Sequence, residues 1–237
     1  MRRLPGGGHR MADPAKREQR WLQACEPPAC RSLMARFRVV RLLQRFDQRC
    51  VWAVFMLVNG CLTIGLLAGM AVLSGTPLVF PSLGAAAFLF FFDPITPSAT
   101  PRHAVIGHAI GICCGYAALT LFGLQHAGSA MAVGVTAPRA LAAALSLGTT
   151  GAFMILLRAP HPPGGATTLI VSLGAMTRPT HLVLLELAVA ALALQAIAIN
   201  RLAGLDYPLW THRKPLGRAG VGRTGPRTAR RDSRVAD

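Results

Sequence analysis

Charged residues are scarce in this sequence, and the shortage is concentrated in its middle. They make up 14% of the 237-residue chain, against about 25% in a typical soluble domain. No Asp, Glu, Lys or Arg occurs between residues 50 and 92, nor between residues 103 and 138. Soluble proteins need charge on their loops and outer faces, whereas apolar runs of this length are typical of membrane spans. The deficit predicts an all-α membrane protein in contact with the lipid bilayer.

The sequence also lacks the residue clusters that metal sites and enzymes require. Cys25 and Cys30 have no His or Cys partners at zinc spacing. Cys61, Cys113 and Cys114 fall inside apolar segments, where cysteine acts as a small apolar residue. No apolar segment offers a nucleophile beside a base, or paired carboxylates. We therefore expect no metal, no cofactor and no enzymatic reaction.

The basic charge that is present lies at the two ends of the chain. Residues 1–49 hold 12 Lys or Arg and residues 201–237 hold 9. Basic residues flanking spans mark the cytoplasmic side, so the pattern predicts a multi-pass protein of a bacterial inner membrane with both termini cytoplasmic. Nucleic acid is not an expected partner, because the basic tails lack interleaved aromatics and any recognisable nucleic-acid-binding domain.

These two terminal regions differ from the middle in composition as well. Residues 1–35 and 201–237 are predicted to be disordered, being rich in Gly, Pro and Arg. Residues 36–49 alternate basic and apolar side chains at roughly helical spacing, which predicts an interfacial amphipathic helix before the first span. The membrane domain is expected over residues 50–200.

Within that domain the sequence divides into six hydrophobic segments. Two of them are short, at about 81–92 and 162–175. A dozen helical residues reach only about 18 Å, against a hydrocarbon core of about 30 Å, so the short segments either span incompletely or re-enter. The four long segments are expected at about 51–73, 103–124, 139–157 and 181–200.

The two halves of the domain resemble each other. Pro81-Ser-Leu-Gly84 aligns with Pro162-Pro-Gly-Gly165, which lies 81 positions later. The order long, short, long occurs twice, over repeats at about 51–124 and 139–200. Because each repeat has three segments, an odd number, the second would be inverted relative to the first. An inverted repeat also places both termini on one side.

Short segments interrupted by Gly and Pro at matching places in inverted halves indicate a transporter binding site. The start of a helix leaves N–H groups unpaired and carries a partial positive charge, which suits an anion. The alternative is that the glycines only let helices pack closely. The candidate substrate-binding residues near the two starts are Ser82, Leu83, Gly84, Gly164, Gly165, Ala166 and Thr167.

Three ionisable residues complete the candidate site. His161 could donate to an anion or carry a proton with it, or it could simply cap the helix. His108 and Glu186 occupy equivalent places in the two halves, so we expect them to pair as a gate or proton relay, since ionisable groups in spans are usually paired or functional. A purely structural pair, or two unrelated polar residues, is the alternative. Gly107-xxx-Gly111-xxx-Gly115 is expected to serve helix packing.

The ordered motifs of the middle region resemble the HPP family of membrane proteins. The resemblance rests on Phe80-Pro-Ser-Leu-Gly-Ala85, Pro101-Arg102, Gly107-His108 and His161-Pro162-Pro163-Gly164-Gly165-Ala166-Thr167. Some plastid and cyanobacterial members of that family transport nitrite, so the resemblance implies a transporter or channel for a small anion such as nitrite. The other interpretation is a non-transporting scaffold or sensor that acts through a protein partner. A homo-oligomer is compatible with both.

Overall fold

The computed structural model describes residues 39–75 and 79–210, and these contain helices without any strand. Four helices, α3, α5, α7 and α9, are long and apolar enough to cross a membrane, and two others, α4 and α8, have only 12 and 11 residues. The all-α architecture with four long and two short segments is therefore confirmed. The bounds are α2 Val39–Leu42, α3 Gln48–Ser74, α4 Pro81–Phe92, η2 Pro97–Ala99, α5 Pro101–Leu121, α6 Ala130–Val133, α7 Ala137–Leu156, α8 Pro162–Ser172 and α9 Pro179–Leu202.

Proline sets the first residue of most of the apolar helices. Pro81, Pro101, Pro162 and Pro179 each occupy the first position of a helix. That position suits proline because its missing N–H would have no partner inside the helix and its φ is already helical. The prolines therefore fix where the short helices begin, and with that they fix the position of the residues that follow.

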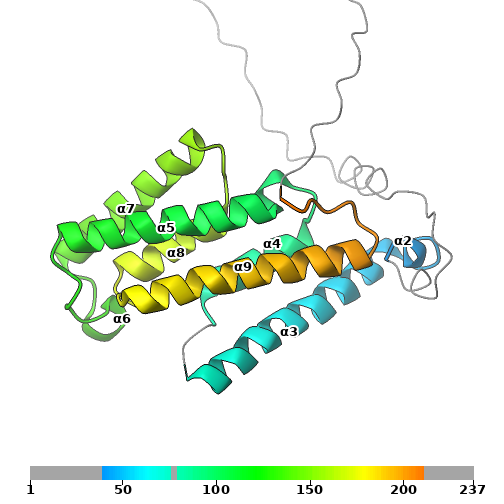
Figure 1. The fold of residues 1–237 in the computed structure, drawn as a ribbon, viewed down its shortest axis with the longest axis horizontal. Coiled ribbons are helices and arrows are strands. Elements are labelled where there is room, and N and C mark those ends of the chain that lie inside the picture. The colour runs from blue at the N-terminus through cyan, green and yellow to red at the C-terminus, as the bar shows by residue number, and fades with distance from the viewer. Residues whose placement is uncertain (1–38, 76–78, 211–237) are drawn as a thin grey trace, which may run out of the picture.

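The long helices α5 and α9 run in opposite directions through the middle of the bundle and contact each other (Figure 1). Helices α7 and α8 pack against α5, while α3 and α4 pack against α9. The short helices α4 and α8 touch, start near the middle of the bundle and lead away from each other (Figure 1). Two helix N-termini therefore lie in the interior.

The core combines aromatic side chains with a few polar cross-links. Phe90 and Phe91 of α4 are fully buried, and the carbonyl of Phe90 accepts a hydrogen bond from Asn200 Nδ2 at 3.1 Å. Gln195 Nε2 donates to Thr63 Oγ1 at 3.1 Å, which ties α9 to α3. Each bond joins helices that are distant in sequence, so both help to set which helices pair.

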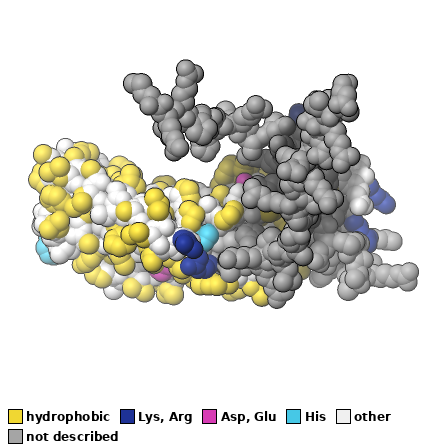
Figure 2. Space-filling model, turned by 90° about the horizontal axis from the view of Figure 1, so that it is seen from above, with side chains coloured by type: hydrophobic (Ala, Val, Ile, Leu, Met, Phe, Trp, Pro, Cys, Tyr) yellow, Lys and Arg dark blue, Asp and Glu magenta, His cyan; other side chains and the backbone are white. Residues whose placement is uncertain are grey.

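The outer surface is apolar, as a bilayer requires. Helix α3 alone exposes Val54, Leu57, Val58, Leu62 and Leu66, and Figure 2 shows hydrophobic side chains covering the visible face of the bundle outside its grey part. Water would disfavour such a surface, whereas lipid tails match it. The structure therefore describes a multi-pass membrane protein.

The expected amphipathic helix over 36–49 is wrong in its described part. Helix α2 ends at Leu42, a turn follows, and Asp47 caps the start of α3 by accepting from the amides of Arg49 at 2.9 Å and Cys50 at 3.3 Å. A short acidic side chain that bonds the backbone in this way favours a helix start over a helix interior. Residues 36–38 lie outside the described residues, as does the predicted disordered segment 1–35.

The predicted tail also begins too early, because residues 201–210 belong to the bundle. Tyr207 is buried, and its hydroxyl donates to the carbonyl of Ala99. The Arg102 amide donates to the Trp210 carbonyl at 3.1 Å. The segment after α9 thus packs against the loop before α5. The rest of the predicted tail, 211–237, lies outside the described residues.

Candidate functional site

Helices α5 and α8 approach each other so closely that only glycine fits between them. A Cβ at Gly111 would collide with the carbonyl oxygen of Gly164, and one at Gly107 would lie 2.5 Å from Cβ of His161. A Cβ at Gly115 would lie 2.9 Å from the Thr168 carbonyl oxygen. The predicted packing role of these glycines is confirmed. Their further effect is to set the buried polar groups of α5 directly against those of α8.

Polar side chains line this contact in an otherwise apolar interior. His108 of α5 shares a hydrogen bond with Thr167 of α8, with 2.7 Å between Nδ1 and Oγ1. Thr168 shares one of 2.9 Å with Thr150 of α7, and all four side chains are buried. Helices α5, α7 and α8 therefore meet along a polar seam, which we define by His108, Thr150, Thr167 and Thr168.

His161 extends the seam at the start of α8. Its Nδ1 lies 2.9 Å from the carbonyl oxygen of Ser98. A carbonyl can only accept, so Nδ1 carries the hydrogen, and in the neutral ring Nε2 then offers a lone pair. The rings of His108 and His161 have centroids 5.0 Å apart, and the ring of Phe90 closes the other side at 6.3 Å. The two imidazoles thus form one buried cluster.

Each imidazole has one nitrogen without a hydrogen-bond partner. Nε2 of His108 and Nε2 of His161 are buried and unbonded among the described residues, and both side chains have 0% exposure. Buried polar atoms in proteins are nearly always hydrogen-bonded, to protein or to water. Two such atoms in one cluster can form hydrogen bonds to a small polar solute or to a water molecule.

Two arginines lie near this cluster in the sequence, at the start of α5 and between α7 and α8. Arg102 Nη1 is 3.4 Å from His103 Nε2 and donates to the carbonyl of Arg158 at 3.5 Å. Arg158 precedes His161 by three residues, and His103 lies one helical turn before Gly107. We call Arg102 and Arg158 the basic rim.

The sequence predicted that the backbone amides at the two helix starts are unpaired and available to an anion. For three of these amides the prediction is wrong. The amides of Leu83 and Gly84 both donate to the Phe80 carbonyl, at 3.0 and 3.2 Å, and that of Gly164 donates to the His161 carbonyl at 2.9 Å. The reason is that the first turn of each helix tightens and uses its own capping carbonyl. These amides are therefore not free for a ligand.

The remaining predicted residues near the two starts differ in their surroundings. Ser82 is buried and its hydroxyl has no partner among the described residues. A Cβ at Gly165 would meet Leu147 of α7 at 3.4 Å, so that position faces away from the imidazoles. Ala166 is half-buried. Of the predicted set, His161 and Thr167 are the residues that the structure joins to His108.

The predicted His108–Glu186 pair is wrong. His108 bonds to Thr167, and both carboxylate oxygens of Glu186 are without a hydrogen-bond partner in the described part of the chain. The sequence explains why the two halves differ. The position 81 residues before Thr167, which the repeat would set beside Glu186, is Ala86 and offers no hydroxyl.

Two residues of the region were missed by sequence reasoning. Thr150 sits in an apolar helix, and its partner on α8 can be found only from the packing. Arg139 is buried, with its guanidinium donating to the carbonyls of Ala127, Gly128 and Ser172 at 3.2, 2.5 and 3.4 Å. It fixes the loop before α7 to the end of α8. The only sequence signal for this role was that a single arginine precedes an apolar segment.

Comparison with known proteins agrees with the motif that opens α8. The profile of the family described as HPP, transmembrane region, matches residues 46–208. The chain belongs to the HPP family. The match covers every helix of this HPP domain from α3 to α9, together with the segment packed behind α9.

One similar protein comes from Dictyostelium discoideum. This transmembrane protein is 32% identical over 128 residues, which are 54% of this HPP chain and 38% of that protein. The HPP chain thus spans well under two thirds of that relative. No solved structure matches it.

Proposed function

We propose that this HPP protein conducts a small monovalent anion, with nitrite as the first candidate, along the polar seam between α5, α7 and α8. The observation that carries the proposal is the pair of buried imidazole nitrogens, on His108 and His161, that have no partner among the described residues. The start of α8 adds a partial positive charge at the same place. The basic rim supplies further positive potential nearby, which raises the local concentration of an anion. The proposal assigns no catalysed reaction to the chain.

The chemistry of His161 favours movement of the anion together with a proton. Its Nδ1 hydrogen is committed to Ser98, so neutral His161 presents a lone pair to the seam and would repel an anion. Once Nε2 is protonated, it donates to the anion and neutralises its charge. A bare charge in the apolar interior is costly, and this cost falls when the charge is paired and hydrogen-bonded. The net event is transfer of the anion with one proton.

We also infer that α3–α4–α5 and α7–α8–α9 are inverted halves. Helix α3 packs on α4 as α7 packs on α8, and α9 contacts α3 and α4 as α5 contacts α7 and α8. The packing of the long helix on the short helix differs between the two halves. Gly107, Gly111 and Gly115 correspond, 78 positions later, to Leu185, Val189 and Ala193. Their larger side chains hold α9 farther from α4, which supports placing the conduction path in the α5–α8 half.

The distribution of basic residues supports an orientation with both termini cytoplasmic. The start of α3 and the end of α9 lie at the same end of the bundle (Figure 1). The basic segments 1–49 and 201–237 adjoin these two helix ends. By the positive-inside rule this end is cytoplasmic, in a bacterial inner membrane.

Flux measurements on purified protein in liposomes test the proposal. Stopped-flow uptake of nitrite, nitrate, formate and chloride should show saturable flux for at least nitrite. Thr167→Val, which removes the partner of His108, should lower that flux more than tenfold. Thr149→Val is the matched control, because the Thr149 hydroxyl bonds only carbonyls of its own helix among the described residues. Absence of flux for all four anions from folded protein would favour the scaffold or sensor interpretation instead.

A further inference from the structure

A groove separate from the polar seam lies between α2 and the first half of α3. Its volume is about 590 Å³. Its walls are almost entirely apolar, and Asn59 adds little polarity because its Nδ2 donates to the Phe55 carbonyl at 2.7 Å. The walls include Val39 and Leu42 from α2, Phe46 from the turn, and Val54 and Val58 from α3. The size and lining suit a hydrocarbon chain.

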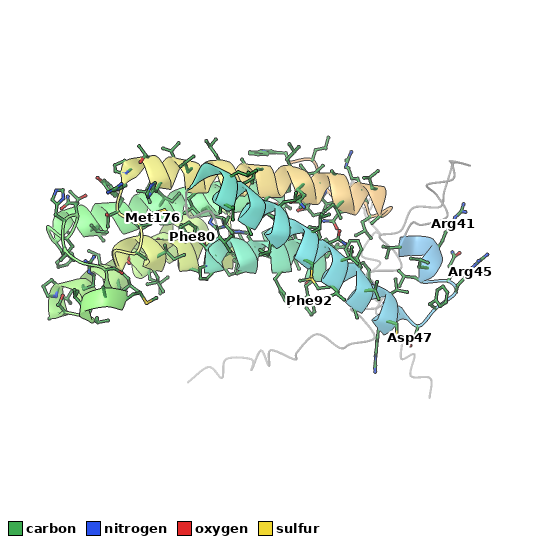
Figure 3. The ribbon with its side chains drawn as sticks, turned by 90° about the horizontal axis from the view of Figure 1, so that it is seen from below. Arg41, Arg45, Asp47, Phe80, Phe92 and Met176 are labelled. Atoms are coloured by element: carbon green, nitrogen blue, oxygen red, sulfur yellow. The ribbon has the colours of Figure 1, made fainter. Side chains whose placement is uncertain are left out.

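Three arginines adjoin wall residues of this groove in the sequence. Arg41 and Arg45 lie on α2 and the turn after it, and Figure 3 shows both at the end of the bundle where α3 starts, with their side chains directed outward. Arg49 precedes Cys50, which is itself a wall residue. Asp47 is the only acidic residue in the sequence from 39 to 75, and its carboxylate accepts from two backbone amides. The charge of three arginines is therefore available to an anion.

We propose that this groove binds an anionic phospholipid, with one acyl chain between α2 and α3 and the phosphate on Arg41, Arg45 and Arg49. Arginine binds phosphate well because its planar donors match the phosphate oxygens. Basic clusters beside a span attract anionic lipid headgroups. The combination of an apolar groove with adjoining arginines distinguishes such a lipid from a neutral one. The proposal does not depend on anion transport by the seam.

Native mass spectrometry of the full chain in detergent tests it. The protein is titrated with phosphatidylglycerol or phosphatidylcholine of identical acyl chains. Phosphatidylglycerol should bind more tightly than phosphatidylcholine. The triple variant Arg41→Gln, Arg45→Gln and Arg49→Gln should lose this preference, with the affinity for phosphatidylglycerol falling about fivefold for each arginine removed. Val54→Trp, which fills the groove, should weaken both lipids. Arg178→Gln, an exposed arginine before α9, is the matched control and should change neither affinity.

Three results would overturn the proposal. The first is equal affinity for the two lipids in the wild-type protein. The second is unchanged phosphatidylglycerol binding in the triple arginine variant or in Val54→Trp. The third comes from a photoreactive group on Cys50, in a variant without the other five cysteines. Cross-linking to residues 1–38 in place of lipid would make the chain's own terminal segment the occupant.

Discussion

The tight contact between α5 and α8 makes a quantitative prediction for Gly111→Ala. The added Cβ would collide with the Gly164 carbonyl and lie 2.9 Å from Thr168 Oγ1, closer than real Cβ atoms approach other atoms. Forcing α5 away from α8 costs about 1–3 kcal/mol, offset by about 0.5–1 kcal/mol because alanine is the better helix residue. The net cost of up to about 2.5 kcal/mol should lower the midpoint of thermal unfolding by up to about 10 °C, measured by circular dichroism in detergent.

Gly65→Ala on α3 is the matched control. Nothing lies within 4 Å of a Cβ built there, so only the gain in helix propensity acts and the midpoint should rise by about 1–4 °C. Gly111→Ala should also reduce anion flux, because the shift lengthens the His108–Thr167 bond. A Gly111→Ala protein as stable as Gly65→Ala would refute the view that this contact excludes a side chain.

Three other substitutions separate the remaining roles. Arg102→Gln should raise the KM for anion uptake several-fold and weaken its salt dependence while leaving the maximal flux unchanged, as measured in liposomes at several salt concentrations. Glu186→Gln should leave flux within about twofold and should not lower the unfolding midpoint, because its carboxylate has no hydrogen-bond partner among the described residues and an ionisable group in a span is costly. Tyr207→Phe should lower stability by about 1–3 kcal/mol by leaving the Ala99 carbonyl unpaired. Burial raises the pKa of Tyr207, so its contribution should decrease above about pH 10, where the unfolded tyrosine ionises, and that part of the pH dependence should be absent from the phenylalanine variant.

The gross architecture could be predicted because its signals are local. The missing charge between residues 50 and 92 is enough to identify spans, and Pro81 and Pro162 mark the first residues of α4 and α8 as the structure has them. Length alone separates the two short helices from the four long ones. Each of these inferences uses neighbouring residues and general membrane physics, so no tertiary contact was needed.

The partners of the site residues could not be predicted, because they depend on how helices pack. His108 bonds Thr167 since the glycines of α5 fix its register on α8, and an alignment of repeats instead pointed to Glu186. The sequence wrongly predicted that the amides of Leu83 and Gly84 are free, because hydrogen bonds within the first turn of a helix have no clear sequence signal. The contact of Tyr207 with Ala99 joins residues 108 positions apart, so residues 201–210 looked like a tail.

The most direct test of the account is the stoichiometry of proton and nitrite uptake in the same liposomes, with a pH dye and a nitrite assay read together. For the wild-type protein we predict saturable uptake of one proton with each nitrite. Both signals should be lost in His161→Ala and kept in Thr149→Val. Nitrite uptake without protons, or uptake that persists unchanged in His161→Ala, would contradict the assignment of the buried imidazoles as the site that carries the anion.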